Sequence, residues 1–176
     1  MNELLELIKT RRSIRRFKPE APPQESLDLI LEAGLYAPSG RGTQNPIILQ
    51  VTNPQLRSKL VTMNREIGGW EDENFDPFYG APVILIVLGK KDMPTRVYDG
   101  SLVMENLMLA AWSLGIGSCW IHRAKEEFET PWGKDLLKSL GITEEYEGIG
   151  HLALGYIEGN SPQAAARDEN RLFYLK

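Results

Sequence analysis

The sequence predicts a mixed fold of helices and strands, of the α+β or α/β class, with one layer of sheet and helices on both faces. Short apolar stretches, roughly four in number, alternate with segments in which apolar residues recur at helical spacing. The chain has 176 residues, 42% of them hydrophobic. This length is enough for a buried core, and residues 1–176 are taken as a single domain.

Two amphipathic helices are expected before the first strand. Apolar residues predict a short helix over residues 4–10. Pro22-Pro23 opens the second helix, because proline suits the first helical turn. Its apolar stripe consists of Leu27, Ile30, Leu31 and Leu35. A loop of small and polar residues, 37–42, ends this helix.

A strand and a capped helix follow. Residues 47–52 predict the strand. Asn53 is a suitable N-cap, with Pro54 at the first helical position. Residues 68–80 form a polar loop that contains several aromatic residues, and the uninterrupted apolar run 83–88 predicts a buried strand.

The next helix is apolar on nearly every side. Asp99 or Ser101 would cap it, and it would run to about Leu114. A helix of this kind is buried all round, either in a core or at an obligate interface.

Two further strands, 118–121 and 149–156, are expected on either side of a helix that Thr130-Pro131 caps and Gly141 ends. The polar tail then finishes with four apolar residues, 172–175. These residues need a surface to pack on, which would be a sheet edge or a second subunit.

Composition excludes several functional classes. The net charge of −4 and the lack of a long basic face argue against a nucleic-acid binder. Cys119 is the single cysteine, so the chain can form no internal disulfide and no cysteine-cluster metal site. Residues 1–10 do not resemble a signal peptide, and the run 81–88 is too short to span a bilayer. We therefore expect a cytoplasmic protein that has no contact with membranes.

The first candidate for chemistry is the basic segment 11–16, which holds four arginines around Ser13 and Ile14. Guanidinium groups bind phosphate oxygens in pairs, and the hydroxyl of Ser13 adds a donor. The alternatives are a solvated basic turn after a helix, where cations suit the helix C-terminus, or a nucleic-acid contact.

The loop 38–45 is the second candidate. Its small residues allow a ligand to approach the backbone, and Ser39, Thr43, Gln44 and Asn45 offer neutral hydrogen-bonding groups. The alternative is an ordinary connection between helix and strand.

The glycine-rich segment 115–122 follows a helix and precedes a strand, which is the reverse of the dinucleotide-binding order, and segment 148–155 meets the same objection. Cys119 lies in an apolar strand and is interpreted as structural. His122 and His151 lack metal-ligand spacing. With no nucleophile or acid–base set, the sequence favours a bound redox cofactor that carries the chemistry.

Four motifs resemble those of the nitroreductase superfamily of FMN enzymes. They are, in order, Arg11 to Phe17, then Ala37-Pro38-Ser39 with Gln44, then Leu114 to Ile121, and then Gly150 to Tyr156 followed by a polar tail. The second motif departs from the usual pattern, since Gly42 stands where Asn is common and Asn45-Pro46 where Pro-Trp is common. The resemblance covers nearly the whole chain.

The resemblance implies an α+β fold with a central, mostly antiparallel sheet flanked by helices, and an intertwined homodimer with two FMN between its subunits. By position, Arg11 and Ser13 would hold the FMN phosphate, with Arg12 beside them, and Arg167 would add a basic contact. Arg15 would face the pyrimidine edge of the flavin.

The remaining implied contacts come from three other segments. Pro38, Ser39 and Gln44 would reach the flavin of the partner subunit. The backbone of Cys119, Trp120, Ile121 and His122 would lie along the isoalloxazine, with an N–H near N5. Asn64 would meet the pyrimidine edge.

The implied function is an FMN-dependent oxidoreductase. It would use NAD(P)H as a diffusible co-substrate in a ping-pong cycle and would reduce a small organic acceptor such as a nitroaromatic or a quinone. The alternative is a flavin-binding protein with little turnover, acting as an FMN store or a redox sensor.

Overall fold

A computed structural model describes residues 2–176, so Met1, which the predicted domain includes, lies outside the described residues. The elements, in chain order, are α1 (Glu3–Thr10), α2 (Gln24–Leu35), a 3-10 turn (Gly40–Gly42), β1 (Ile47–Val51), α3 (Pro54–Gly68), β2 (Val83–Lys90), α4 (Arg96–Ser113), β3 (Ile116–Ile121), α5 (Ala124–Glu129), α6 (Pro131–Ser139) and β4 (Tyr146–Tyr156). Within those residues no helix is both long and apolar enough to cross a membrane.

The four strands form one sheet in the order β1-β2-β4-β3, and every neighbouring pair is antiparallel. The α+β prediction and the antiparallel sheet are therefore confirmed, and the α/β alternative is wrong. Strand β2 is central and its first seven residues are buried, as expected for a strand that is apolar without alternation.

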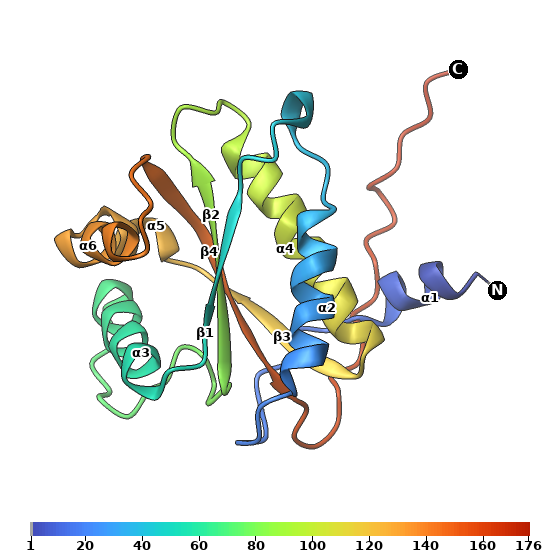
Figure 1. The fold of residues 1–176 in the computed structure, drawn as a ribbon. Coiled ribbons are helices and arrows are strands. Elements are labelled where there is room, and N and C mark those ends of the chain that lie inside the picture. The colour runs from blue at the N-terminus through green and yellow to red at the C-terminus, as the bar shows by residue number, and fades with distance from the viewer. Residues whose placement is uncertain (1) are drawn as a thin grey trace.

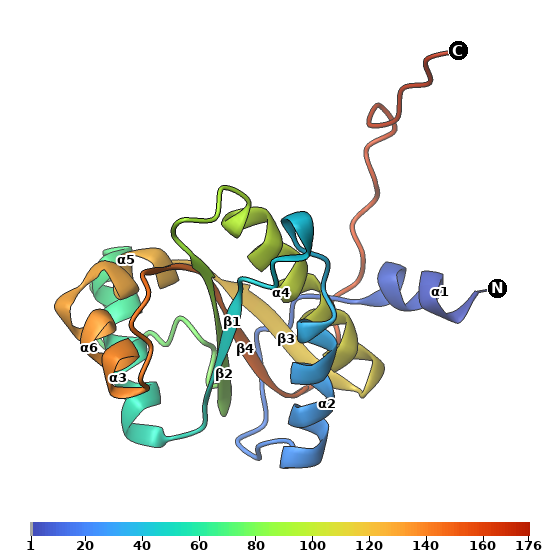
Figure 2. The ribbon, with the colours of Figure 1, turned by 45° about the horizontal axis from the view of Figure 1, so that its top comes forward.

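Helices cover both faces of this sheet (Figures 1 and 2). Alternate side chains of β2 pack on opposite faces of the sheet, because successive side chains of a strand point to opposite sides. Ile84 and Ile86 belong to the core under α3, α5 and α6, whereas Val83 and Leu85 belong to the core under α2 and α4. Gly34 lets α2 approach α4 closely, since a Cβ there would lie 2.7 Å from Leu107 Cδ2.

The predicted caps are right for two helices and wrong for a third. Asn53 Oδ1 accepts from Leu56 N at 2.9 Å, and Thr130 Oγ1 accepts from Gly133 N at 3.2 Å. Helix α4, however, starts at Arg96 with Thr95 as its N-cap, so neither Asp99 nor Ser101 caps it. The buried side chain of Asp99 instead accepts hydrogen bonds from Gly40 and Asn45 in the loop after α2, a contact that the sequence did not indicate.

Two elements also differ from the prediction. Helix α5, which is six residues long, was not predicted. Strand β4 begins at Tyr146 rather than near residue 149, because its first residues pair with the end of β2 beyond a bulge at Val87/Leu88.

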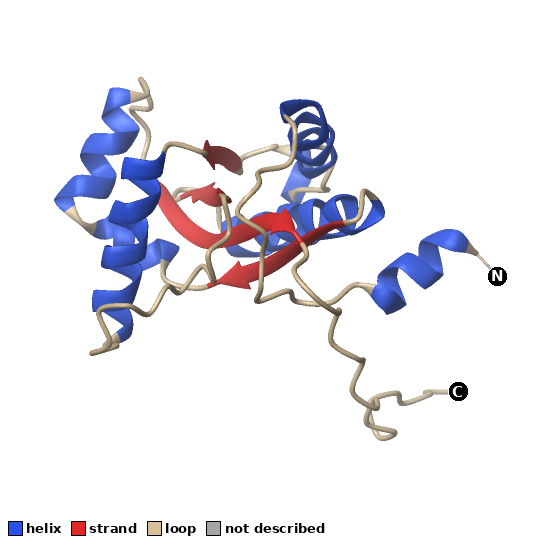
Figure 3. Cartoon of the chain, turned by 90° about the horizontal axis from the view of Figure 1, so that it is seen from below, coloured by secondary structure: helices blue, strands red, loops and turns tan. Residues whose placement is uncertain are grey.

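One side of the molecule exposes apolar surface. Helix α4 buries Met104 and Leu107 completely, but Tyr98 is 71% exposed and Leu102 is 43% exposed. The polar tail leaves the body beyond β4 without regular structure (Figures 1 and 3), and its closing residues 172–175 are at least 75% exposed. Helix α1 also stands away from the body, and each of its residues is at least partly exposed.

Candidate cofactor site

The basic segment is an extended strip pinned beside the sheet. Ile14 N donates to Ser118 O at 2.9 Å, and Lys18 N donates to Tyr156 O at 2.9 Å. Ile14 and Phe17 are buried in the core, whereas Arg15 is exposed. These two hydrogen bonds hold the arginines beside strand β3 and the C-terminal end of strand β4.

A hollow of about 280 Å³ lies over this strip. It is lined by Arg11, Arg12, Ser13, Arg15, Arg167 and the tail segment 162–165. The structure therefore brings together the four residues that the resemblance assigns to the phosphate and Arg15, one of the two that it assigns to the pyrimidine edge, although Arg167 is distant from the others in sequence. Asn64, the other residue assigned to that edge, does not line this hollow.

Two guanidinium nitrogens of the arginines that line this hollow have no partner among the described residues. Among the described residues, nothing accepts a hydrogen bond from Arg11 Nη1 or Arg12 Nε, although both atoms are buried. Arg12 Nη1 donates to Lys9 O at 2.7 Å, and Arg11 Nε lies 3.9 Å from Glu105. Buried donors without acceptors are costly, and phosphate oxygens would satisfy them. The residues present thus fit the phosphate of FMN.

The second motif lies elsewhere in the same chain. Pro38, Ser39 and Gln44 line two adjoining hollows of about 140 and 500 Å³, beside the C-terminal end of α2. Ser39 Oγ accepts from Gln44 N at 2.8 Å, which holds Gln44 with a φ of 49°. The basic hollow is lined by other segments, so one chain presents two separate sets of predicted contacts.

The buried carboxylate of Asp99 clamps this loop. It accepts hydrogen bonds from Gly40 N at 2.9 Å, from Asn45 Nδ2 at 2.5 Å and from Thr95 Oγ1 at 2.7 Å. Asn45, one of the departures from the usual motif, is thereby a partner of Asp99. Burial alone would raise the pKa of Asp99, but these hydrogen bonds outweigh it and hold the pKa below its ordinary value.

The third motif is strand β3 and the residue after it. Cys119, Trp120 and Ile121 end the strand, and His122 is exposed. Burial raises the pKa of the Cys119 thiol, although Arg15, Ser13 and Arg11 oppose this shift. A thiol that is protonated at neutral pH is a poor nucleophile, which supports the structural interpretation.

The loop between α3 and β2 borders the same region. The Arg15 guanidinium lies 6.0 Å from the ring centroid of Tyr79, and that of Arg123 lies 4.5 Å from the ring centroid of Trp70. The loop thus meets the basic strip at one point and the end of β3 at another.

A buried polar cluster lies behind the end of β3. The side chains of Asn64, Glu127 and His151 are fully buried, and Asn64 Nδ2 donates to His122 O at 2.8 Å. Contact of Asn64 with the flavin remains a prediction. The sequence did not indicate a role for Glu127 or His151. Glu127 lies on a helix that was not predicted, and His151 lies in an apolar strand, so no sequence pattern shows that the two side chains pair.

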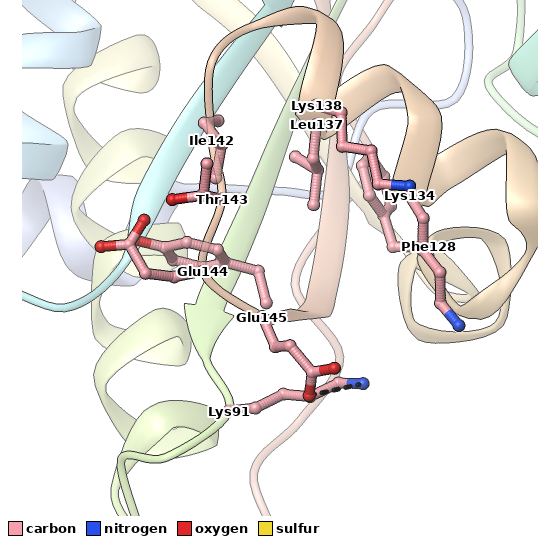
Figure 4. Close-up of a pocket in the computed structure, with 10 residues that line it drawn as sticks. Lys91, Phe128, Lys134, Leu137, Lys138, Ile142, Thr143, Glu144 and Glu145 are labelled. Atoms are coloured by element: carbon pink, nitrogen blue, oxygen red, sulfur yellow. Dashed lines mark ion pairs between the residues drawn. The ribbon is translucent and has the colours of Figure 1, made fainter.

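A further hollow, of about 170 Å³, contains none of the predicted site residues. It lies between α6 and the start of β4, and its lysines flank an apolar floor that includes Phe128 and Leu137 (Figure 4). Lys91 Nζ lies 4.0 Å from Glu145 Oε2 there. This hollow is not part of the candidate cofactor site.

Comparison with known proteins explains why these motifs occur together. The sequence profile of the Nitroreductase family matches residues 8–156. The chain belongs to the nitroreductase family. This confirms the resemblance, and the match spans both the basic strip and the last strand.

Individual relatives agree with the family assignment. A Methanothermobacter thermautotrophicus protein provisionally named NADH dehydrogenase/NAD(P)H nitroreductase is 32% identical over 99% of this chain and 87% of its own length. Iodotyrosine deiodinase of Thermotoga neapolitana is 32% identical over 67% of this chain and 73% of its own length. The crystal structure of a Bacteroides fragilis nitroreductase with bound FMN superposes with a TM-score of 0.89 at 30% identity, and the alignment covers 100% of both chains.

Proposed function

We propose that this nitroreductase-family chain is an FMN-dependent oxidoreductase that works as a homodimer. The observation that carries the proposal is the hollow at the basic strip, where buried guanidinium nitrogens of Arg11 and Arg12 find no acceptor within residues 2–176. The FMN bound to the related Bacteroides fragilis structure supports the choice of ligand.

Different residues of the hollow would bind different parts of FMN. Arg11, Arg12, Ser13 and Arg167 would bind the phosphate by charge-assisted hydrogen bonds. Arg15 would supply a positive charge at the pyrimidine edge, which favours the negative charge of a reduced flavin. The Cys119–His122 backbone would lie along the ring system.

The second set of contacts would come from the partner subunit. In one chain, Pro38, Ser39 and Gln44 line hollows separate from the basic strip. A two-fold dimer can bring such a loop to the partner's site, because each subunit contributes both surfaces. The exposed apolar side chains of α4 and of the tail are available to form the interface.

Bound FMN would supply hydride transfer, taking a hydride from NAD(P)H and passing it to a small organic acceptor such as a nitroaromatic or a quinone. In this chain, helix α4 comes before Gly115 and strand β3 follows it, the reverse of the dinucleotide-binding order. NAD(P)H is therefore proposed as a visiting co-substrate that leaves before the acceptor enters, in a ping-pong cycle.

The experiment is to record the visible spectrum of the purified protein anaerobically while NADH or NADPH is added. We expect two flavin bands that one nucleotide bleaches and that a nitroaromatic or quinone then restores. Flavin bands that neither nucleotide bleaches would favour the FMN store or redox sensor instead. A colourless protein that FMN cannot reconstitute would contradict the proposed function.

A further inference from the structure

The buried polar cluster behind β3 links three elements to one peptide group. Glu127 on α5 lies between the other two residues: its Oε2 is 2.8 Å from His151 Nε2 on β4, and its Oε1 accepts from Asn64 Nδ2 on α3 at 3.0 Å. The same Asn64 Nδ2 donates to the carbonyl oxygen of His122 at 2.8 Å. All three side chains are fully buried.

The partners determine how each group in the cluster is oriented. Asn64 faces two acceptors, a carboxylate and a carbonyl, so its NH₂ must point toward them. His151 Nδ1 is buried, and nothing within residues 2–176 bonds to it. A proton on His151 Nε2 therefore points at Glu127 Oε2. Glu127 thus receives a donor on each oxygen.

The hydrogen bond from Asn64 to the His122 carbonyl also fixes the direction of the backbone N–H of Arg123. The described residues contain no cis peptide, so the carbonyl of His122 and the N–H of Arg123 point in opposite directions within one plane. Since Asn64 holds the carbonyl toward the interior, the Arg123 N–H points away from the cluster. Among residues 2–176 it meets no hydrogen-bond acceptor.

The conformation of Arg123 is also unusual. Its φ of 81° and ψ of 7° lie in the left-handed region, which residues other than glycine rarely adopt. Such strain persists only where the surroundings impose it, and it is concentrated at binding and catalytic sites. Here Asn64 holds the peptide from one side, while the Arg123 guanidinium packs on Trp70.

The peptide lies at the candidate cofactor site. It directly follows β3, which is joined to the basic strip by the hydrogen bond from Ile14 N to Ser118 O at 2.9 Å. The loop that packs on Arg123 through Trp70 also contacts Arg15 through Tyr79. The unpartnered N–H thus belongs to the region where the flavin ring is proposed to bind.

We propose that Glu127 and His151, acting through Asn64, are positioning residues that hold the His122–Arg123 peptide so that the Arg123 N–H donates to an acceptor on the isoalloxazine ring. The inference rests on the proposed FMN function and adds to it residues with no direct flavin contact. Oxidised flavin offers acceptors at N5 and at the neighbouring carbonyl oxygen.

The test follows the Arg123 amide directly. Protein labelled with ¹⁵N-arginine gives few amide signals, and that of Arg123 is assigned by its absence in Arg123→Lys. In the wild type, FMN is expected to shift this signal and to slow its exchange with solvent. In Asn64→Leu, a variant of similar shape, the carbonyl is released, so we expect the slowing to be lost and FMN to bind about five- to tenfold more weakly.

Two further variants keep the test decisive. Glu127→Gln retains the shape of the side chain but offers only one acceptor oxygen, so a smaller change in the same direction is expected even if Asn64→Leu fails to fold. Leu60→Val is the matched control, because Leu60 is fully buried on the same helix α3. It should lower the melting temperature and leave both the Arg123 signal and FMN affinity unchanged.

The outcomes separate this inference from the proposed function. Wild-type protein that binds FMN while its Arg123 amide stays unaffected would overturn the inference alone. Unaltered protection of that amide in both Asn64→Leu and Glu127→Gln would do the same. Failure of the wild type to bind FMN would overturn the proposed function, and the inference with it.

Discussion

Arg11 and Arg16 lie in the same basic segment but have different surroundings. The Arg11 side chain is 23% exposed and has a buried nitrogen that meets no acceptor in the described part of the chain, whereas that of Arg16 is 76% exposed and lies 3.6 Å from Glu158. At the scale of single residues, burial and pairing therefore distinguish Arg11, which is proposed to bind phosphate, from the surface residue Arg16.

This contrast gives a prediction with a built-in control. Arg11→Ala should weaken FMN binding about ten- to a hundredfold, because a hydrogen bond to a charged group contributes about 1.5–3 kcal/mol. The variant should be purified largely without flavin, as the ratio of flavin to protein absorbance would show. Arg16→Ala should retain its flavin. Full flavin occupancy in Arg11→Ala would refute the role given to Arg11.

Cys119 is interpreted as a structural residue without a role in binding or catalysis, and this interpretation can be tested. Burial raises the pKa of its thiol, so the folded protein should react slowly with iodoacetamide at neutral pH, and unfolding should restore rapid labelling. Cys119→Ser should keep both FMN and turnover. If a folded, flavin-bound Cys119→Ser protein were inactive, the thiol would have a catalytic role instead.

At the scale of elements, Asp99 connects helix α4 to the loop of the second motif. Its carboxylate is 3% exposed and receives hydrogen bonds from Gly40, Asn45 and Thr95. The clamp explains how a loop that departs from the usual motif at Asn45 still holds Ser39 and Gln44 in a defined arrangement.

Replacement of this carboxylate should destabilise the protein in a pH-dependent way. Asp99→Asn directs an NH₂ group at other donors, so we expect a loss of about 2–3 kcal/mol of unfolding free energy at neutral pH. Because the pKa of Asp99 is lowered in the folded state, its contribution is fully present above the unfolded pKa and is lost as the pH falls through the folded pKa.

The difference in unfolding free energy between wild type and Asp99→Asn should accordingly be constant above about pH 5 and shrink below about pH 4. Urea titrations across this range measure it. Asp92→Asn is a suitable control, since Asp92 is paired only loosely with Lys90 at 4.0 Å. A difference that stayed constant down to pH 2 would show that the charge of Asp99 is not responsible.

At the scale of the whole molecule, the exposed apolar surface predicts a dimer. Tyr98 and Leu102 on α4 and the tail residues 172–175 are exposed in the single chain, and large exposed apolar areas mark interaction surfaces. Size-exclusion chromatography with light scattering should give twice the chain mass of 19.9 kDa. A stable, folded monomer would rule out the proposed arrangement of the cofactor site.

The tail can be tested separately. Leu172→Ser combined with Phe173→Ser should make the dimer dissociate on dilution, because both side chains would leave an apolar interface for water. Leu140→Ser is the control: Leu140 is 56% exposed at the C-terminal end of α6, and helix α6 lies away from α4 and the tail (Figure 1). Equal behaviour of the two variants in dilution experiments would show that the tail does not contribute to the interface.

The sequence by itself determined a mixed fold of helices and strands, the approximate positions of the strands, two helix caps and the resemblance to the family. These features depend on local patterns: apolar periodicity, the hydrogen bonds of Asn53 and Thr130, and motifs whose residues are adjacent in the chain. The basic strip was recognisable for the same reason, since its arginines lie within six residues of one another.

Tertiary structure alone decided which distant residues meet. It turned Asp99 from an expected cap into a loop clamp and joined Asn64, Glu127 and His151 behind one peptide. The physical reason is that a buried polar group requires partners, and those partners can come from any part of the chain that packing brings near. No local pattern records that choice.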